Sequence, residues 1–135
     1  MERIVIDTNV LISSAITSGG NPEKIMNLVS DRQLMLYYSR KIINEYERVL
    51  AYEKFGIKDL TQAKIINSIK FLGILIEPEV SNIPFSDESD KTFYDTAKTS
   101  ASTLVTGNIK HFPDEPFIMT PADFIIRINN SSIYL

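Results

Sequence analysis

Asp7 is the acidic residue whose setting first suggests chemistry. It follows Ile4, Val5 and Ile6, three β-branched apolar residues in a row. An apolar run without alternation is typical of a central parallel strand that is covered on both faces. Asp7 would then lie at the carboxyl end of that strand, where open α/β sheets bind their ligands. A buried carboxylate needs a cation or hydrogen-bond donors. This stretch supports two interpretations of Asp7 equally: a ligand for a divalent metal, or the N-cap of the next helix.

Two glutamates follow the second predicted strand. Hydrolysis of a phosphodiester with Mg²⁺ or Mn²⁺ needs a few carboxylates that meet at one sheet edge. At about 100° per residue, Glu45 and Glu47 flank the apolar face of their helix on opposite sides. Periodicity alone does not choose between them. For either glutamate, a solvated position on the helix surface is the more common outcome.

The predicted helix that follows Asp87 places its acidic residues on different sides. Asp90 falls inside the apolar sector of this helix, whereas Asp95 points away from it. A helix N-terminus favours negative charge, but this does not explain an aspartate that faces the core. A metal shared with Asp7 does explain it. We predict that Asp87 is the N-cap and that Asp95 is a surface carboxylate.

Two further polar residues follow the fourth predicted strand. Asn108, in Thr106-Gly107-Asn108, fits either a left-handed turn residue or a neutral oxygen ligand at the same sheet edge. His111 is the only histidine, and no serine lies in a G-x-S-x-G pattern that it could serve. We interpret His111 as structural or as a minor substrate contact. Neither a G-x-G-x-x-G motif nor a Walker loop is present, so nucleotide binding of those kinds has no support.

Alternating strands and helices would position these residues. Strands are predicted at 3–7, 34–38, 74–76, 103–106 and 117–119. Helices are predicted at 8–16, 22–30, 40–52, 62–72, 88–101 and 121–129, with N-caps at Asn21, Ser39, Asp87 and Thr120. The order βααβααβαβα predicts an α/β fold, a three-layer αβα sandwich around a mainly parallel five-stranded sheet.

The bulk composition is that of an ordinary globular protein. The 135 residues suit one domain, 1–135, and 44% of them are hydrophobic. The absence of cysteine excludes disulfides and thiolate metal sites. No apolar run could span a bilayer and no signal peptide is recognisable, so we expect a cytoplasmic protein without a membrane partner. A net charge of −3 argues against a protein that coats nucleic acid.

Five sequence blocks together resemble the PIN domain family. They are Ile4-Val5-Ile6-Asp7-Thr8-Asn9-Val10-Leu11-Ile12, Ser39-x-x-Ile42-x-x-Glu45, Asp87-x-x-Asp90-x-x-Phe93-Tyr94-x-x-Ala97, Leu104-Val105-Thr106-Gly107-Asn108 and Thr120-Pro121-x-x-Phe124. The resemblance covers essentially the whole chain and is closest to PIN-family toxin components of toxin–antitoxin systems. It implies a Mg²⁺- or Mn²⁺-dependent endoribonuclease that acts on RNA through a metal-activated water and is held by a small antitoxin protein.

The resemblance also implies roles for individual residues. It assigns Asp7, Glu45 and Asp90 to the acidic metal-binding positions and so chooses Glu45 over Glu47. Asn108 lies where many PIN domains have a fourth acid, which leaves the number of metals at one or two. The residues Thr8, Asn9 and Thr106 match polar positions of the family that orient the metal ligands or a bound water. RNA contacts would come from Arg40, Lys41 and Lys110, for which the role of ordinary solvated charges is at least as well supported.

Other functions fit parts of the same pattern. A catalytically weak PIN-fold module that binds RNA or protein is the first alternative, and Asn108 leaves it open. A receiver-type phosphotransfer domain also places an aspartate at a strand end. However, it would usually have a lysine at the end of the last strand, where this chain has Met119-Thr120-Pro121. A metal-dependent DNA nuclease would share the site and differ only in substrate. A homodimer is expected only by analogy.

Overall fold

The structure is a computed structural model that describes residues 1–131. Its strands are β1 (Glu2–Ile6), β2 (Leu34–Tyr38), β3 (Ile74–Leu75), β4 (Thr103–Val105) and β5 (Ile118–Met119). Its helices are α1 (Thr8–Ile16), α2 (Asn21–Ser30), α3 (Arg40–Leu50), α4 (Asp59–Leu72), α5 (Glu88–Ser100) and α6 (Pro121–Asn130). Short 3₁₀ helices lie at Glu53–Phe55 and Ile109–His111. Within these residues, no helix combines the length and apolar character needed to span a membrane.

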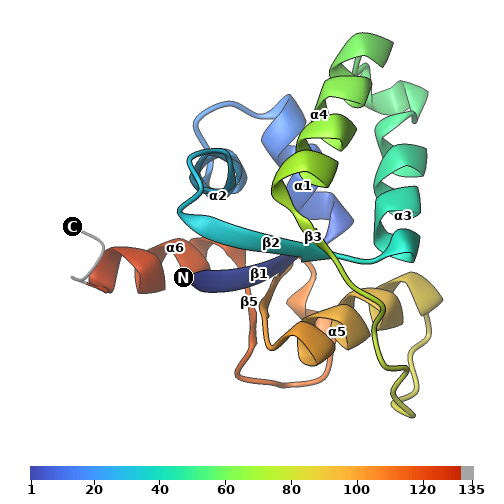
Figure 1. The fold of residues 1–135 in the computed structure, drawn as a ribbon, viewed down its shortest axis with the longest axis vertical. Coiled ribbons are helices and arrows are strands. Elements are labelled where there is room, and N and C mark those ends of the chain that lie inside the picture. The colour runs from blue at the N-terminus through green and yellow to red at the C-terminus, as the bar shows by residue number, and fades with distance from the viewer. Residues whose placement is uncertain (132–135) are drawn as a thin grey trace.

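The five strands form one parallel sheet in the order β3-β2-β1-β4-β5. Helices α1 to α4 lie on one side of this sheet and α5 lies on the other, where it packs against β1, β2 and β4 (Figure 1). Helix α6 runs beside α2. The predicted three-layer α/β architecture is therefore confirmed.

Strand β1 is central because neither of its faces meets water. Ile4, Val5 and Ile6 are each at most 1% exposed, so this continuous apolar run is consistent with a strand that has neighbours on every side. From β1 the chain builds β2 and β3 on one side, and then β4 and β5 on the other. The strand order therefore reverses between β1 and β4. In open α/β sheets, the crevice at the carboxyl ends of two such strands is the usual ligand site.

Some predicted helix boundaries are wrong in detail. Helix α4 begins at Asp59 and not at Gln62, because the exposed polar first turn that we interpreted as a break is itself helical. Asp59 stabilises this turn through the helix dipole. Helix α2 begins at Asn21, so Gly20 and not Asn21 occupies the cap position, and the Glu23 carboxylate accepts a hydrogen bond from the Gly19 amide. Ser39, Asp87 and Thr120 are N-caps as predicted.

Candidate metal centre

Asp7 lies at the crevice between β1 and β4 and is only 6% exposed. One carboxylate oxygen accepts a hydrogen bond from the Thr8 amide at 2.7 Å, which makes Asp7 the N-cap of α1. The other oxygen accepts one from the Thr106 hydroxyl at 2.7 Å, across the two strand ends. The interpretation of Asp7 as an N-cap is therefore confirmed. Its second carboxylate oxygen is oriented by Thr106, which directly follows β4.

A polar network fixes the turn after β4 against the start of α1. The Asn9 side chain lies 3.4 Å from Asp7 Oδ2 as a donor and accepts a hydrogen bond from the Gly107 amide at 3.1 Å. The Asn108 amide donates to the Thr106 hydroxyl at 3.0 Å, so this hydroxyl both donates and accepts. The buried Thr8 hydroxyl has no hydrogen-bond partner among the described residues. These contacts orient Asp7 from two sides.

Asn108 has a backbone φ of −119°, so the interpretation as a left-handed turn residue is wrong. The Thr106 hydroxyl provides the physical reason, because it accepts a hydrogen bond from the Asn108 amide and holds this residue outside the left-handed region. The Asn108 side chain is exposed at the sheet edge that bears Asp7. Its role as a neutral ligand stays a prediction.

Helix α3 brings Glu45 toward this edge. Tyr46, which follows it, is fully buried, and its hydroxyl donates to the Ile6 carbonyl at the end of β1. Burial, followed by the charge of Asp7, holds the pKa of Tyr46 well above its ordinary value of 10. Glu45 is 19% exposed and forms an ion pair with Arg48, one turn further along α3. Glu47 is about half exposed and pairs with Lys70 at 3.8 Å, away from the other acids.

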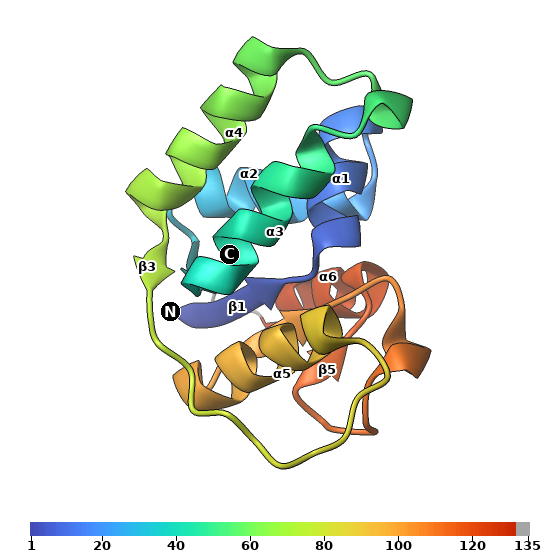
Figure 2. The same cartoon turned by 90° about the vertical axis from the view of Figure 1, so that its right-hand side faces the viewer.

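Helix α5 begins near the carboxyl end of β1 (Figure 2). Asp87 caps this helix by accepting from the Ser89 amide at 2.8 Å. The Asp90 side chain is 16% exposed, and its Oδ2 lies 3.6 Å from Nδ1 of His111. The spacing of His111 three residues after Asn108 did not suggest this contact, because a tertiary approach between α5 and the turn after β4 creates it.

The charges of these acids act on one another. Burial raises the pKa of Asp7, hydrogen bonds from Thr106 and Thr8 lower it, and the charge of Glu45 raises it further. Burial, followed by the charges of Asp7 and Asp87, raises the pKa of Asp90 to about 6. Each carboxylate thus lies within the electrostatic field of the others. Neither Asp7 nor Asp90 forms an ion pair with a lysine or arginine in the part of the chain that the structure describes.

The donor set fits a hard divalent cation, although the side chains do not close around one. Carboxylate and amide oxygens are the ligands that Mg²⁺ and Mn²⁺ prefer. In residues 1–131, no three acidic or histidine side chains are close enough together to enclose an ion as they stand. Glu45 is one reason why the acidic side chains do not converge, because Arg48 holds its carboxylate. Asp7, which is buried and has no basic partner, is the residue that most needs a cation.

The predicted surface position of Asp95 is wrong. Its side chain is 4% exposed, and Oδ2 forms an ion pair with Lys91 at 3.1 Å. Helix periodicity could not show this, because the burial of a helix face depends on the segments that pack against it. The segment between β3 and α5 meets this helix near its carboxyl end, where the Glu79 amide donates to the Thr99 hydroxyl. The Lys91 pair sets Asp95 apart from the site acids.

The three cations predicted to contact RNA are exposed. Arg40 and Lys41 start α3, and Lys110 lies in the 3₁₀ helix after Asn108. Sequence reasoning missed Arg48, although its spacing of three residues from Glu45 is that of a helical ion pair.

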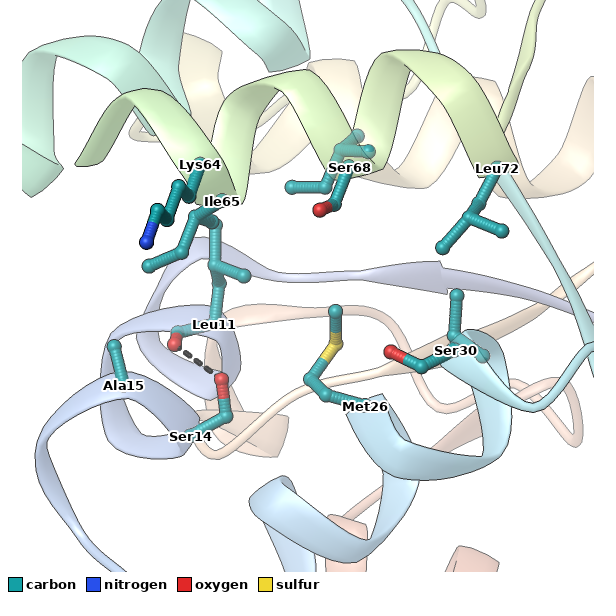
Figure 3. A pocket seen from close by; sticks show the side chains of 11 residues that line it. Leu11, Ser14, Ala15, Met26, Ser30, Lys64, Ile65, Ser68 and Leu72 are labelled. Atoms are coloured by element: carbon teal, nitrogen blue, oxygen red, sulfur yellow. Dashed lines mark hydrogen bonds between the residues drawn. The ribbon is translucent and has the colours of Figure 1, made fainter. Parts of the chain in front are cut away.

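A second hollow lies away from the carboxylates. It has a volume of about 240 Å³ and lies between α1, α2 and α4 (Figure 3). Met26, Ile65 and Leu72 line it among other residues, together with serines and the single cation Lys64. It contains no acidic residue, so it offers no alternative metal site.

Comparison with known proteins agrees with this architecture. The sequence profile of the PIN domain family matches residues 3–110. An uncharacterised protein of Methanocaldococcus jannaschii is 29% identical over 109 residues, which make up 78% of this chain and 70% of the relative. The open parallel sheet with acids at its switch point is a nuclease-type fold. The chain belongs to the PIN domain family, as the five sequence blocks predicted, and members of this family are generally nucleases.

Proposed function

We propose that this protein is a Mg²⁺- or Mn²⁺-dependent endoribonuclease. The observation that carries the proposal is the acidic crevice: Asp7 and Asp90 have raised pKa values, and within residues 1–131 neither has a lysine or arginine partner, His111 being the one basic side chain beside Asp90. A protein keeps such a costly arrangement where a cation offsets it. Family membership supports the choice of a nuclease among metal-binding functions.

Asp7, Glu45 and Asp90 would hold the cation, with Asn108 as a further oxygen donor. When bound, the cation would offset their charge, polarise a phosphoryl oxygen and lower the pKa of the attacking water. Thr106 and the Thr8 amide hold the two oxygens of Asp7, so this carboxylate is oriented before any ligand arrives. Thr8 and Asn9 complete the polar surroundings. Asp87 and Asp95 have no part in this set, because Asp87 caps α5 and Asp95 is paired with Lys91.

The biological role that we propose is that of a toxin in a toxin–antitoxin pair. RNA is the substrate, a small antitoxin protein is the partner, and the cytoplasm is the expected location. The apolar hollow between α1, α2 and α4 supports a protein partner, because it is a recess that the site does not use. Lys41, Arg40 and Lys110 are exposed near the crevice and would contact RNA phosphates.

A second candidate function is a PIN-fold module that binds RNA or protein without efficient turnover. Two points favour it: the acids do not enclose a cation site as they stand in residues 1–131, and the resemblance to PIN domains puts Asn108 where many of them have a fourth acid. A measurement of RNA cleavage therefore distinguishes the nuclease from the binding module more directly than a measurement of RNA binding does.

The experiment is cleavage of single-stranded and structured RNA with Mg²⁺ or Mn²⁺ by the wild type, Asp7→Asn and Asp90→Asn. Asp31→Asn, at the exposed end of α2, is the matched control. We expect cleavage that needs the metal, is lost in both site variants and is retained in the control. Equal cleavage by all variants would defeat the metal-carboxylate proposal. Absence of metal-dependent cleavage by the wild type would favour the binding module.

A further inference from the structure

One face of α3 carries a series of charged residues around Glu45. Lys41, Glu45 and Arg48 are spaced by four and three residues, and positions three or four apart lie on one helix face. Tyr52 extends this series just beyond the end of the helix, where the Arg48 guanidinium contacts its hydroxyl. The proposed function uses Glu45 from this series and treats Lys41 only as a general phosphate contact. Arg48 and Tyr52 have no role in it.

The series ends in a pair of stacked aromatic rings. Tyr52 and Phe55 have ring centroids 6.2 Å apart and planes inclined by only 13°. Two cations lie over these rings: Lys54 lies 5.2 Å from the Phe55 centroid, and the Arg48 guanidinium lies 5.7 Å from that of Tyr52. Tyr52 is 38% exposed. A partly exposed aromatic pair with flexible cations above it can receive another flat ring.

Arg48 connects the aromatic pair to the acidic crevice. Its guanidinium contacts the Glu45 carboxylate and the Tyr52 hydroxyl at the same time. Beside it, a cleft of about 310 Å³ lies between α3 and α5, both of which face the viewer in Figure 2. The polar residues that line this cleft come from both helices: Lys41, Asn44, Glu45 and Arg48 from α3, and Glu88, Ser89 and Thr92 from α5. Arg48 lines the cleft and also contacts Tyr52, so a path leads from the cleft through Arg48 to the rings.

We propose that the Tyr52–Phe55 pair is a base-stacking subsite for a single RNA strand bound along this path. An unpaired base stacks on the ring pair, and Lys41 and Arg48 hold phosphates of the same strand. Cations alternating with aromatic rings match a single strand, because its bases are free to stack on protein side chains while a duplex keeps them paired inside. An acidic peptide would use the cations and leave the ring pair without a purpose. The proposal deepens the nuclease function and rests on it, since it names a subsite for the substrate of that site.

The test measures binding of a fluorescein-labelled, non-self-complementary RNA 12-mer by anisotropy in EDTA, where no metal-dependent cleavage occurs. Single-stranded and duplexed forms are compared. Base stacking predicts that Tyr52→Ala and Phe55→Ala each weaken single-strand binding by about 5-fold to 150-fold. Tyr52→Phe retains most of the affinity because it keeps the ring. Arg48→Ala weakens binding and lowers the slope of log K against log salt by about one.

Phe71→Ala is the matched control. Phe71 lies on α4 and is 77% exposed, with the Arg32 guanidinium 5.5 Å from its ring centroid, and neither residue lines the cleft between α3 and α5. Its loss should leave RNA affinity unchanged. A melting curve checks that each variant is folded, and Arg48→Ala, at a side chain that is 57% exposed, keeps the test decisive if an alanine variant of the ring pair is not folded.

The RNA-binding proposal and the nuclease proposal can be refuted independently of each other. If the wild type binds single strands through Tyr52 and Phe55 but does not cleave them with Mn²⁺, the RNA path stands and the nuclease proposal falls. If the wild type cleaves RNA while Tyr52→Ala and Phe55→Ala bind single strands as tightly as it does, the RNA path is overturned. Preferred binding of the duplex, or no binding of RNA at all, overturns it as well.

Discussion

Asp7 and Asp95 are both buried aspartates, with exposures of 6% and 4%, but different groups surround them. Asp95 lies 3.1 Å from the Lys91 ammonium on its own helix. Asp7 receives only neutral donors and lies in the field of Glu45. Burial alone therefore does not identify a functional carboxylate. The informative difference is whether the fold itself supplies the opposite charge.

The same difference separates stability from function. The Asp95–Lys91 pair is self-contained, so its loss should affect folding and leave the crevice chemistry intact. The Asp7–Asp90 pair is strained electrostatically, so it should cost stability until a cation arrives. Each of the following predictions tests one side of this comparison.

The largest effect is expected from Lys91→Met, which leaves Asp95 buried and unpaired. Breaking a buried ion pair from one side costs about 3–5 kcal/mol, and both side chains are at most 13% exposed. The free energy of unfolding, measured with urea at pH 7, should fall by that amount. Lys70→Met is the control, because its pair with Glu47 is 3.8 Å long and half exposed, and should cost less than about 1 kcal/mol. Similar losses in the two variants would refute the distinction.

Thr106→Val removes the hydroxyl that orients Asp7 Oδ2. Partners that orient metal ligands are typically worth about 10-fold to 100-fold in metal affinity, so Mn²⁺ binding measured by calorimetry should weaken by that factor. The pKa of Asp7 should rise further, because the hydrogen bond from Thr106 lowers it.

Thr96→Val provides the comparison for this prediction. Thr96 is also fully buried, but its hydroxyl donates to the Thr92 carbonyl within α5. Mn²⁺ affinity should stay at the wild-type value in this variant. An equal loss in both variants would show that the effect is general to the fold and does not act through Asp7.

Asn108→Asp adds a carboxylate to the crevice, where no lysine or arginine offsets it. The crevice then differs even more from the surroundings of Asp95, which is paired with Lys91. Affinity for a hard cation rises with the number of charged ligands, and we expect Mn²⁺ to bind about tenfold more tightly, or about 1.4 kcal/mol. Calorimetry checks this. The metal-free protein should become less stable at pH 8 because of the added repulsion. Unchanged affinity would place the Asn108 side chain outside the metal site.

The smallest effect is expected from pH. Asp7 and Asp90 have raised pKa values in the folded state, that of Asp90 to about 6. Each therefore stabilises the fold below its unfolded pKa, near 4, and this contribution is lost as pH rises through the folded value. In EDTA, the contribution of these two groups should lower the melting temperature between pH 4 and pH 7. Asp90→Asn should make the plot of melting temperature against pH flatter.

Added Mg²⁺ should reverse this trend, because a cation binds the ionised carboxylates and its affinity therefore rises with pH through about 6. An identical pH profile for the wild type and Asp90→Asn would contradict the assignment of a raised pKa to this carboxylate.

Local pattern accounts for much of the fold. The apolar run Ile4–Ile6 identified the central strand, and the caps Ser39, Asp87 and Thr120 were found because a short polar side chain precedes an apolar helix. The start of α4 was missed because its first turn is exposed and polar. Periodicity detects a helix only where one face is buried.

The sequence by itself determined the family, the order of strands and helices, and the placement of Asp7 at the end of a buried strand. Each of these follows from neighbours along the chain. Only the tertiary structure decided that Thr106 orients Asp7, that His111 lies beside Asp90 and that Asp95 is buried. These contacts depend on which side chains the packed elements bring together. The charge balance at a buried carboxylate is set by those neighbours and not by its own position in the chain.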